Sequence, residues 1–299
     1  MHYEKEPIHI IFICDETYVM PTAVAITSLC MNKRPDTLYS VHILACDISY
    51  SSQLLLQKLE KDTVQIEVLN QTPPLVLKEC VIDNLHVSTA ALYKFNIANL
   101  FQEYDKALYL DGDILIKKDL TDLYETNITN AYAAVVKDYK PMTYNPPQVS
   151  KLGINHKCYF NSGVMLLNLK KFREDDIFHK LLDYRLHGIN YFMDQDALNV
   201  VFSENVVYLS FFYNVMSSVM GYFKIEEILE YYELTHVESK DKIYEEATIV
   251  HLCTKYKPWS YFNVPFADEW TFYYNYSGIV EPLNRRKLEI TLQKRCFLN

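Results

Sequence analysis

The sequence contains little glycine, little proline and no long uninterrupted apolar run. Six Gly and 11 Pro among 299 residues are too few for a fibrous or low-complexity chain. The longest mostly apolar stretch, residues 200–223, is broken by Glu204, Asn205 and Asn214, so it predicts buried strand and loop and no membrane helix. The apolar run over 8–14 is too short for the hydrophobic region of a signal peptide.

Positive charge is also scarce. The chain has 29 Lys and Arg against 38 Asp and Glu, which gives a net charge of −9. Such a chain repels a phosphate backbone, so the sequence predicts no nucleic-acid partner. A small phosphorylated ligand stays compatible with this charge, because a bound metal ion can reverse the local field. With 49% hydrophobic and 22% charged residues, the chain is expected to fold around a sizeable core.

The seven cysteines are odd in number and contain no C-x-x-C pair. This pattern argues against a disulfide framework or a cysteine-rich zinc site, and it favours the reduced thiols of a cytoplasmic protein. Tyrosine is abundant, with 25 residues. Its ring offers an apolar face and a hydroxyl group, which suits sugar binding, although tyrosines also fill protein cores.

Strands and helices are predicted to alternate over the first 70 residues. A continuous apolar run predicts a buried strand at 9–14, and further strands are predicted at 39–46 and 65–69. Helices are predicted between them, at 21–33 and from Ser49 or Ser51 to 61. This alternation predicts an α/β fold with a doubly wound, mostly parallel sheet. Farther along we expect strands at 107–110, 132–136, 163–169 and 248–253, helices at 89–102 (capped by Ser88), 175–187, 194–202 and 225–232, a long loop at 139–153, and a short aromatic helix from 267.

The central chemical signal is Asp111-Gly112-Asp113, directly after a short apolar strand. Ligands of open α/β sheets bind at the carboxyl ends of strands, and paired carboxylates there suit Mg²⁺ or Mn²⁺. His251 follows a later predicted strand and could add a nitrogen ligand, which shifts the preference toward Mn²⁺. Taken alone, the spacing of the acidic pair favours a solvated turn, and a lone histidine favours a structural residue. Lys257 could meet a diphosphate oxygen.

Five motifs occur together in one order along the chain: Phe12–Tyr18, Leu108–Leu115, Tyr159–Leu169, Asp194–Asn199 and His251–Trp259. Through them the sequence resembles glycosyltransferase family 8 from about residue 8 to residue 260. That family groups retaining enzymes such as bacterial lipopolysaccharide galactosyl- and glucosyltransferases and glycogenin. The resemblance therefore suggests a bacterial enzyme of lipopolysaccharide or other cell-surface glycan biosynthesis.

The resemblance implies a GT-A fold, which is a Rossmann-like, mixed and mostly parallel sheet flanked by helices. The catalytic domain is predicted over 1–265, and the residues after it predict a short C-terminal helical tail over 266–299. The donor would be a UDP-sugar, and Mn²⁺, with Mg²⁺ as the alternative, would be held by Asp111, Asp113 and His251. The remaining implied contacts are Asp15 to uracil, Lys257 to the diphosphate, and Asn161, Gly163, Asp138, Asp194 and Gln195 around the sugar and the acceptor entry.

Three donor-binding positions depart from the family pattern. Thr17 stands where Asn is frequent, Lys94 where an Arg often reaches the donor, and Thr254 where Gly is usual. Lysine offers one point charge in place of the bidentate fork of arginine, so the grip on the donor or the choice of sugar is expected to differ. All three implied metal ligands are retained.

For the reaction itself, Gln195, Asp194 and Asp138 are the candidate catalytic residues. Retention by double displacement needs a carboxylate on the face opposite the leaving group. The resemblance places Gln195 there, which is a poor nucleophile, and Asp194 is the nearest alternative. We therefore expect the acceptor hydroxyl to attack from the leaving-group face.

The sequence thus predicts a Mn²⁺-dependent retaining transferase that moves glucose or galactose from a UDP-hexose to a glycan, glycolipid or glycoprotein acceptor. One alternative is a non-catalytic nucleotide-sugar-binding or assembly subunit. Another is a phosphatase of the haloacid-dehalogenase type, which Leu115 and the late position of Asp111 disfavour.

Asn214 is interpreted as structural. The basic tail could touch the inner face of a membrane, although a solvated helix face is the simpler interpretation; its charges are Arg285, Arg286, Lys287, Lys294 and Arg295.

Overall fold

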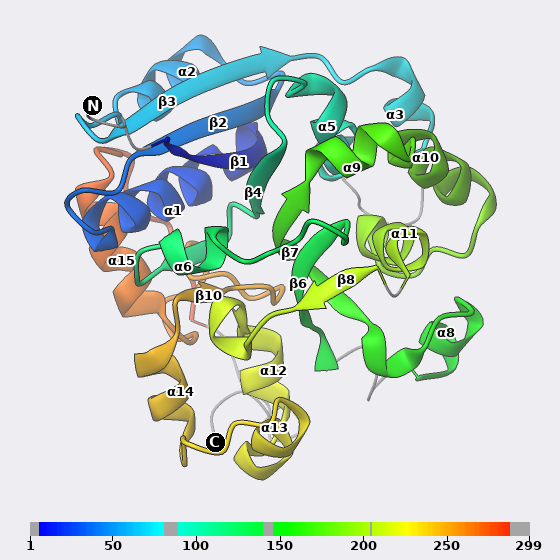
Figure 1. Cartoon of the computed structure of the whole chain (residues 1–299). Helices are drawn as coiled ribbons and strands as arrows, with labels where there is room; N and C mark the ends of the chain where they lie inside the picture. The colour runs from blue at the N-terminus through cyan, green and yellow to red at the C-terminus, as the bar shows by residue number, and fades with distance from the viewer. Residues whose placement is uncertain (1–5, 81–88, 140–145, 204, 288–299) are drawn as a thin grey trace, which may run out of the picture.

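The first 70 residues form the alternating strands and helices that the sequence predicts. The computed structural model describes residues 6–80, 89–139, 146–203 and 205–287 (Figure 1). Three parallel strands, β1 (Ile8–Asp15), β2 (Tyr39–Cys46) and β3 (Val64–Gln71), are connected by α1 (Val19–Asn32) and α2 (Tyr50–Gln57). The doubly wound arrangement is therefore confirmed.

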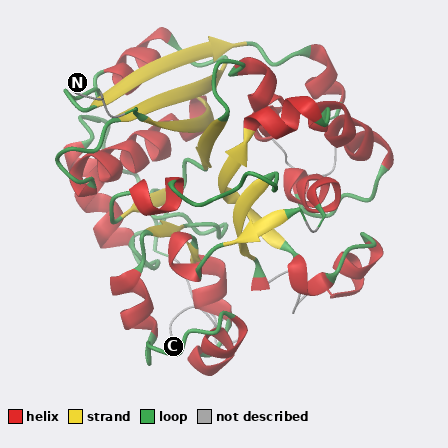
Figure 2. Cartoon of the chain, viewed as in Figure 1, coloured by secondary structure: helices red, strands yellow, loops and turns green. Residues whose placement is uncertain are grey.

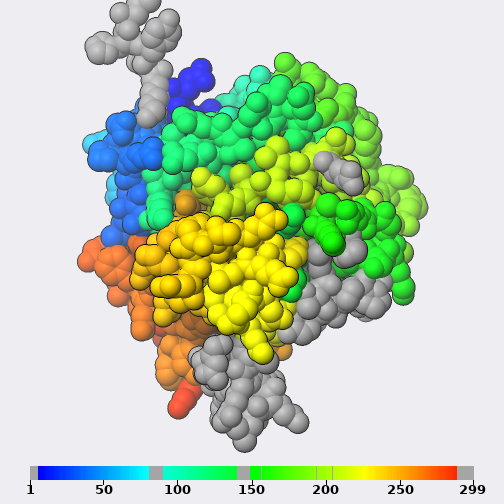
Figure 3. Space-filling model, turned by 60° about the horizontal axis from the view of Figure 1, so that its bottom comes forward, coloured from blue at the N-terminus to red at the C-terminus, as the bar shows by residue number. Residues whose placement is uncertain are grey.

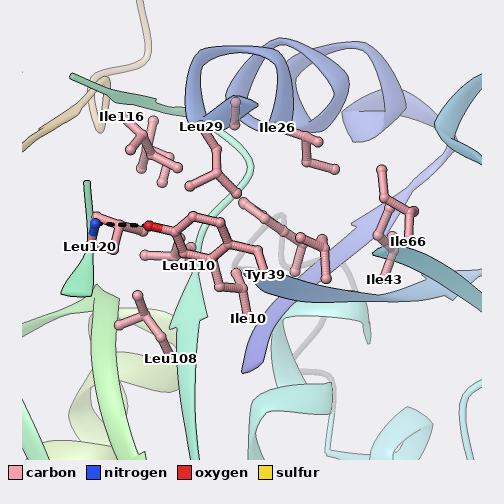
Figure 4. Packing of buried hydrophobic residues seen from close by; sticks show 14 of the residues in the cluster. Ile10, Ile26, Leu29, Tyr39, Ile43, Ile66, Leu108, Leu110, Ile116 and Leu120 are labelled. Carbon is pink, nitrogen blue, oxygen red and sulfur yellow. Dashed lines mark hydrogen bonds between the residues drawn. The ribbon is translucent and has the colours of Figure 1, made fainter. Parts of the chain in front are cut away.

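β1 shows why its apolar run is continuous. Ile10 and Phe12 pack into the core beneath α1, whereas Ile11 and Ile13 pack into a second core on the opposite face of the sheet. A strand buried on both faces needs apolar residues at every position. Figure 4 shows the first core, where the hydroxyl of Tyr39 accepts a hydrogen bond from the backbone N–H of Leu120 at 2.9 Å.

The larger sheet has seven strands in the order β3-β2-β1-β4-β7-β6-β8. β7 runs antiparallel to both of its neighbours, and the other neighbouring pairs are parallel, so the predicted mixed, mostly parallel sheet is confirmed. The four strands not yet named are β4 (Lys106–Leu110), β6 (Ala133–Lys137), β7 (Phe160–Asn168) and β8 (Val206–Tyr208).

Helices cover both faces of this sheet (Figures 1 and 2). α1 and α2 contribute to the first core, and the second core lies beneath the helices on the other face. The helices of the second face are α4 (Thr89–Leu92), α5 (Ile97–Leu100), α9 (Leu169–Glu174), α10 (Ile177–His187) and α11 (Met193–Phe202). Two short helices, α3 (Leu75–Glu79) and α6 (Thr121–Tyr124), lie in connections.

A second, three-stranded sheet has the order β5-β10-β9, with β5 (Ile114–Ile116), β10 (Ile249–His251) and β9 (Val215–Met216). Its core is completed by α12 (Ser217–Tyr222), α13 (Ile225–Tyr231), α14 (Lys240–Glu246) and α15 (Ala267–Tyr276). Figure 3 shows α13 and α14 gathered in yellow and orange on one face of the molecule. Trp270 of α15, only 1% exposed, anchors the C-terminal helix in this core.

Three predicted elements differ in detail. The helix expected over 89–102 is divided by a 3₁₀ turn (Tyr93–Asn96), and its expected cap, Ser88, lies outside the described residues. The loop expected over 139–153 contains α8 (Pro146–Lys151), because proline is tolerated in the first turn of a helix. The helix expected from 175 begins at Ile177, after a separate α9. Three further 3₁₀ turns are Glu16–Tyr18, His156–Cys158 and Phe211–Tyr213.

None of the described helices combines the length and the apolar character needed to cross a membrane. The six cysteines in the described part of the chain form no disulfide with one another. The predicted division of the chain at residues 265 and 266 stays a prediction.

Candidate functional site

The predicted site residues meet at one edge of the larger sheet. The parallel strands β1 and β4 both end at this edge: Asp15 is the last residue of β1, and Asp111 follows β4. β7 runs in the opposite direction, so its first residues, including Asn161, lie at the same edge. Asp138 follows β6, and the first turn of α11 brings Asp194. Topology therefore gathers residues that are far apart in the sequence.

These residues line a cavity of about 680 Å³. Most of the predicted positions contribute to its wall: Asp15, Lys94, Asp111, Asp113, Asp138, Asn161, Asp194, Gln195, His251 and Lys257. Three predicted residues are not part of the lining. The hydroxyl of Thr17 donates to Asp15 Oδ1 at 2.6 Å, that of Thr254 donates to the carbonyl of Tyr256 at 3.1 Å, and Gly163 lies behind the acidic pair.

Asp111, Asp113 and His251 form a compact group of potential metal ligands. Each offers one ligand atom, and these atoms lie within 4.8 Å of one another. His251 Nε2 lies 3.6 Å from Asp111 Oδ2 and 3.3 Å from Asp113 Oδ1. Two carboxylates and one imidazole are a suitable ligand set for Mn²⁺, and less so for Mg²⁺.

The backbone explains how this group forms. The chain crosses from β4 of the larger sheet to β5 of the smaller one through Asp111-Gly112-Asp113. In the larger sheet, the N–H of Asp111 donates to the carbonyl of Gly163 at 2.8 Å. In the smaller sheet, Leu252 N–H donates to the carbonyl of Asp113 at 2.8 Å, next to His251. The two acids thus sit at the junction of the two sheets, each fixed to a different one.

Gly163 leaves the space that the two metal-facing side chains occupy. A Cβ atom at this position would lie 2.2 Å from His251 Cε1 and 2.7 Å from Asp111 Oδ2. Both distances are far shorter than any van der Waals contact. The family motif around residue 163 therefore has a steric reason in this site.

Lys257 binds the second oxygen of Asp113. Its ammonium lies 2.5 Å from Asp113 Oδ2 and 2.7 Å from the carbonyl of Leu252. Burial alone would raise the pKa of Asp113, but the positive charges of Lys257 and His251 outweigh it and hold that pKa well below its usual range. Asp113 is therefore ionised, with Oδ1 toward His251 and Oδ2 toward Lys257.

The imidazole of His251 is buried, which disfavours its charged form. Interactions with Cys253, Asp113 and Asp111 nevertheless raise the pKa of His251 to about 9. A divalent cation would compete with this proton for Nε2. Metal binding at this group should therefore release protons.

Lys94 is a buried ammonium group between two acids. Nζ lies 2.8 Å from Asp194 Oδ2 and 3.2 Å from Asp111 Oδ1, and the side chain is 5% exposed. Burial would lower the pKa of Lys94, but Asp111 and Asp194 outweigh it and raise the pKa above its usual value. The ring of Tyr109 lies beneath the ammonium at 4.8 Å, and its hydroxyl donates to Asp111 Oδ1 at 2.6 Å.

Gln195, Asn161 and Asp138 form a connected polar group on the other side of the cavity. Gln195 Oε1 accepts from the backbone N–H of Ser162 at 3.1 Å and from Asn161 Nδ2 at 3.2 Å. Gln195 Nε2 in turn donates to Asp138 Oδ2 at 3.3 Å. Asp194, next along the chain, also accepts from the hydroxyl of Ser162 at 3.0 Å.

Asp15 stands at the entrance of the cavity, at the end of β1. Its carboxylate accepts from the backbone N–H groups of Thr17 and Tyr18 at 3.0 and 3.2 Å, which caps the following 3₁₀ turn. Glu16 clamps the start of α2 from the same turn, since its carboxylate accepts from the backbone N–H of Ser49 at 2.9 Å. The loops after β1 and β2 are thereby joined.

Sequence reasoning missed several residues of the cavity wall. Tyr18 and Ser162 lie inside motifs that were quoted for other residues, and Tyr191 and Phe192 lie three and two residues before Asp194. Proximity to these motifs was a usable signal for all four. The remaining missed wall residues are Ile13, Cys14, Ala90, Ala91, Tyr109, Gly112, Ser218 and Cys253.

The chain is similar to glycosyltransferases over most of its length. The model of glycosyl transferase family 8 matches residues 9–263. A lipopolysaccharide 1,2-glucosyltransferase of Escherichia coli (strain K12) is 28% identical over 262 residues, which are 85% of this chain and 73% of that protein. Glycosyltransferase GlyB of Streptococcus pneumoniae serotype 4 is 28% identical over 268 residues, and the chain spans 61% of its length.

The fold also matches solved structures. The crystal structure of the galactosyltransferase LgtC in complex with donor and acceptor sugar analogs superposes with a TM-score of 0.76 at 24% identity. The match covers 92% of this chain and 98% of that one. The glycosyltransferase fold expected from the sequence, GT-A, is thereby confirmed.

Proposed function

The chain belongs to glycosyl transferase family 8, and from that membership and the geometry of the cavity we propose a metal-dependent, retaining hexosyltransferase. It transfers glucose or galactose from a UDP-sugar to a glycan, glycolipid or glycoprotein acceptor of the bacterial cell surface. The observation that carries the proposal is the group Asp111, Asp113 and His251 in the wall of a cavity of about 680 Å³. This volume suits a ligand of the size of a nucleotide-sugar.

The residues at the junction of the two sheets fit a divalent cation. Two carboxylate oxygens and one imidazole nitrogen favour Mn²⁺ and accept Mg²⁺. Gly163 supports this assignment, because any side chain there would fill the space of the ligands. When bound, the metal supplies electrostatic stabilisation of the diphosphate leaving group.

Different residues of the protein bind different parts of the donor. Asp15 faces the uracil, with Thr17 holding one of its oxygens. Lys257 shares its ammonium between Asp113 and the Leu252 carbonyl, and from there it meets the diphosphate. Lys94 holds the carboxylates of Asp111 and Asp194 in one orientation through two ion pairs, and it thereby fixes the wall of the sugar subsite.

For the chemical step we propose attack of the acceptor hydroxyl from the leaving-group face. Asp194 is a hindered nucleophile, because its Oδ2 binds both Lys94 and the hydroxyl of Ser162. The amide of Gln195 is held at both ends, so it orients the sugar without forming a bond to it. Asp138 lies beside Gln195 at the acceptor entry. A trapped glycosyl-enzyme on Asp194 would contradict this route.

For location we propose the cytoplasm, with a weak contact of the basic tail at the inner face of the membrane. Arg285 donates to the hydroxyl of Thr271 at 2.7 Å, which holds its charge against α15, the helix that also carries the exposed aromatic rings of Phe272 and Tyr276. Aromatic rings next to basic side chains favour an anionic lipid surface. Flotation with phosphatidylglycerol vesicles at low salt should retain the protein, and equal recovery with neutral vesicles would contradict the contact.

The test of the function is UDP release from a panel of UDP-sugars, with and without Mn²⁺. We expect slow, metal-dependent release from UDP-glucose or UDP-galactose. Asp113→Asn should abolish it, because an amide cannot replace the ionised ligand. Asp122→Asn is the matched control, since Asp122 is an exposed acid paired with Arg34 outside the cavity.

The alternative outcome separates an enzyme from an idle binding subunit. If no UDP-sugar is hydrolysed, UDP binding that requires Mn²⁺ would preserve the donor site and point to an enzyme that needs its acceptor. Absence of UDP binding would contradict the proposal altogether. Release of inorganic phosphate from simple phosphomonoesters would instead revive the phosphatase alternative.

A further inference from the structure

A row of hydrogen bonds connects the metal-facing histidine with the opposite side of the cavity. His251 Nδ1 lies 3.1 Å from Asn214 Oδ1, and Asn214 Nδ2 lies 2.9 Å from Asn161 Oδ1. Asn161 Nδ2 continues the row to Asp138 Oδ2 at 3.4 Å and to Gln195 Oε1 at 3.2 Å. Asn214 is fully buried and belongs to none of the motifs of the chain.

The direction of this row is fixed at its far end by a group that can only donate. The backbone N–H of Gly163 points at one amide atom of Asn161 at 3.0 Å, so that atom is the oxygen. The other amide atom of Asn161 faces a carboxylate oxygen of Asp138, as a nitrogen must. The two amide positions of Asn161 are therefore determined by chemistry and not by convention.

The orientation of Asn161 determines the orientation of the next two side chains. Because Asn161 presents its oxygen, Asn214 must present its nitrogen to it, and hence its own oxygen to His251. An oxygen acceptor at Nδ1 requires a proton on Nδ1. Neutral His251 then carries its lone pair on Nε2, the atom that lies between Asp111 and Asp113.

We propose that Asn214 is a positioning residue that holds His251 in the tautomer whose Nε2 binds the metal ion. The donor–acceptor direction of the row is fixed by the backbone N–H of Gly163 in β7, and Asn214 passes it from Asn161 to His251. The inference rests on the proposed metal-dependent function. Partners of this kind on the second nitrogen of a ligating histidine change metal affinity by about 10- to 100-fold when they are removed. Asn214 also ties the metal group to Asn161 on the sugar side.

The first experiment measures Mn²⁺ binding without nucleotide, by the electron paramagnetic resonance signal of free Mn²⁺. Asn214→Leu keeps the approximate volume but removes the acceptor, and we expect affinity to fall about 10- to 100-fold. Asn214→Asp keeps an oxygen acceptor for His251 but places a second acceptor against Asn161 Oδ1, so it should retain more Mn²⁺ affinity than Asn214→Leu. Loss of affinity in Asn214→Asp equal to that in Asn214→Leu would overturn the proposal, as would full affinity in Asn214→Leu.

Asn32→Leu is the matched control. Asn32 is a part-buried amide whose Nδ2 binds the carbonyls of Ser28 and Ile116 and the hydroxyl of Tyr273, away from the cavity. Its replacement removes three side-chain hydrogen bonds, one more than Asn214→Leu removes, so it should lower stability without changing Mn²⁺ affinity. An equal fall in Mn²⁺ affinity in Asn32→Leu would show that the loss follows from destabilisation, and would overturn the proposal.

A second measurement does not depend on any Asn214 variant. Long-range ¹H–¹⁵N spectra of the Mg²⁺-saturated wild type report which ring nitrogen of each histidine carries the proton, and His251→Gln assigns the signal. We expect His251 to be protonated at Nδ1, and protonation at Nε2 would overturn the inference. Wild-type protein that binds no Mn²⁺ would overturn the proposed function as well, whereas binding that is unaffected in Asn214→Leu would overturn the inference alone.

Discussion

At the scale of single residues, Lys94 carries a buried positive charge in the wall of the cavity. Its ammonium is shared by Asp111 and Asp194, and its side chain is almost entirely removed from water. A buried ammonium of this kind is tolerated only because two carboxylates compensate it. Lysine at this position therefore has a structural task in addition to any contact with the donor.

Lys94→Met should lower the free energy of unfolding by about 3 kcal/mol at neutral pH, because it leaves buried carboxylate without a counter-charge. The loss should shrink at pH 5, because a buried carboxylate without a counter-charge is protonated more readily as the pH falls. Denaturant unfolding at both pH values measures this. Lys94→Arg keeps the charge and should lose much less stability, while changing the ratio of activity on UDP-glucose and UDP-galactose.

Lys106→Met serves as the matched control at the other end of β4. Lys106 donates to the carbonyl of Tyr124 at 2.8 Å, and no carboxylate partner of its ammonium is found among the described residues. Its removal leaves no buried negative charge, so its effect should be smaller and independent of pH. An equal, pH-independent loss in both variants would show that Lys94 acts through packing alone.

Residue identity was predictable from the sequence wherever the chemistry lies in a short motif. Asp111, Asp113 and His251 were named in advance and do lie together. Asn214 was interpreted as structural, because its role arises from the pairing of β9 with β10, which no local pattern reveals. Side chains that act through a neighbour carry no spacing signal of their own.

At the scale of elements, β1 and β2 were predictable because both are buried on both faces, and β3 because buried and exposed residues alternate along its first half. β5 was not predicted. It has only three residues, and its pairing with β10 is a long-range contact that no local pattern specifies. The crossing of the chain from β4 to β5, which places the two acids, followed from tertiary structure alone.

Gly163 allows a test of how tightly β7 fits the metal group. In Gly163→Ala the new Cβ would meet His251 Cε1 at 2.2 Å, and His251 is held in place by Asn214 and by its pairing with β5. The histidine or Asp111 must move, so Mn²⁺ affinity should fall at least about 10-fold while the circular dichroism spectrum stays that of the folded protein. Undiminished Mn²⁺ binding would show that the ligands lie elsewhere.

Gly153→Ala is the control for this substitution. Gly153 has a φ of +74°, and a Cβ there would meet no atom of the described chain within 4 Å. Alanine in this left-handed conformation costs about 1 kcal/mol of stability through backbone strain. It should leave Mn²⁺ affinity unchanged, so stability and metal binding are separated by the pair of variants.

At the scale of the whole molecule, the fold class was predictable from the order of apolar runs, and the arrangement of the second sheet was not. The small sheet is assembled from segments near residues 115, 215 and 250, and α15 completes its core through Trp270. Such contacts form because segments far apart in the sequence bury their apolar side chains against one another. They explain why the C-terminal helix, expected as a tail, packs against the rest of the protein.

Stability of the whole molecule should also depend on a histidine cluster below β1 and β2, remote from the cavity. The ring of His9 stacks on Tyr104 at a centroid distance of 3.8 Å and lies 5.8 Å from the ring of His42. The Nδ1 atom of His9 is buried without a hydrogen-bond partner among the described residues. Burial, and secondly the charge of His42, lower the pKa of His9 from 6.5.

A lowered pKa in the folded state means that the unfolded chain binds this proton more readily, so stability rises with pH. The contribution of His9 is present above its unfolded pKa of 6.5 and is lost as the pH falls below that value toward the folded pKa. His9→Phe keeps a stacked ring but cannot be protonated. The wild type should therefore lose stability relative to His9→Phe between pH 7.5 and pH 5.5. The measurement is the free energy of unfolding against pH for both proteins, because the difference between the two curves cancels the titrating groups that they share. A difference that does not change with pH would mean that His9 binds its proton equally well in the folded and the unfolded chain, and it would contradict the prediction.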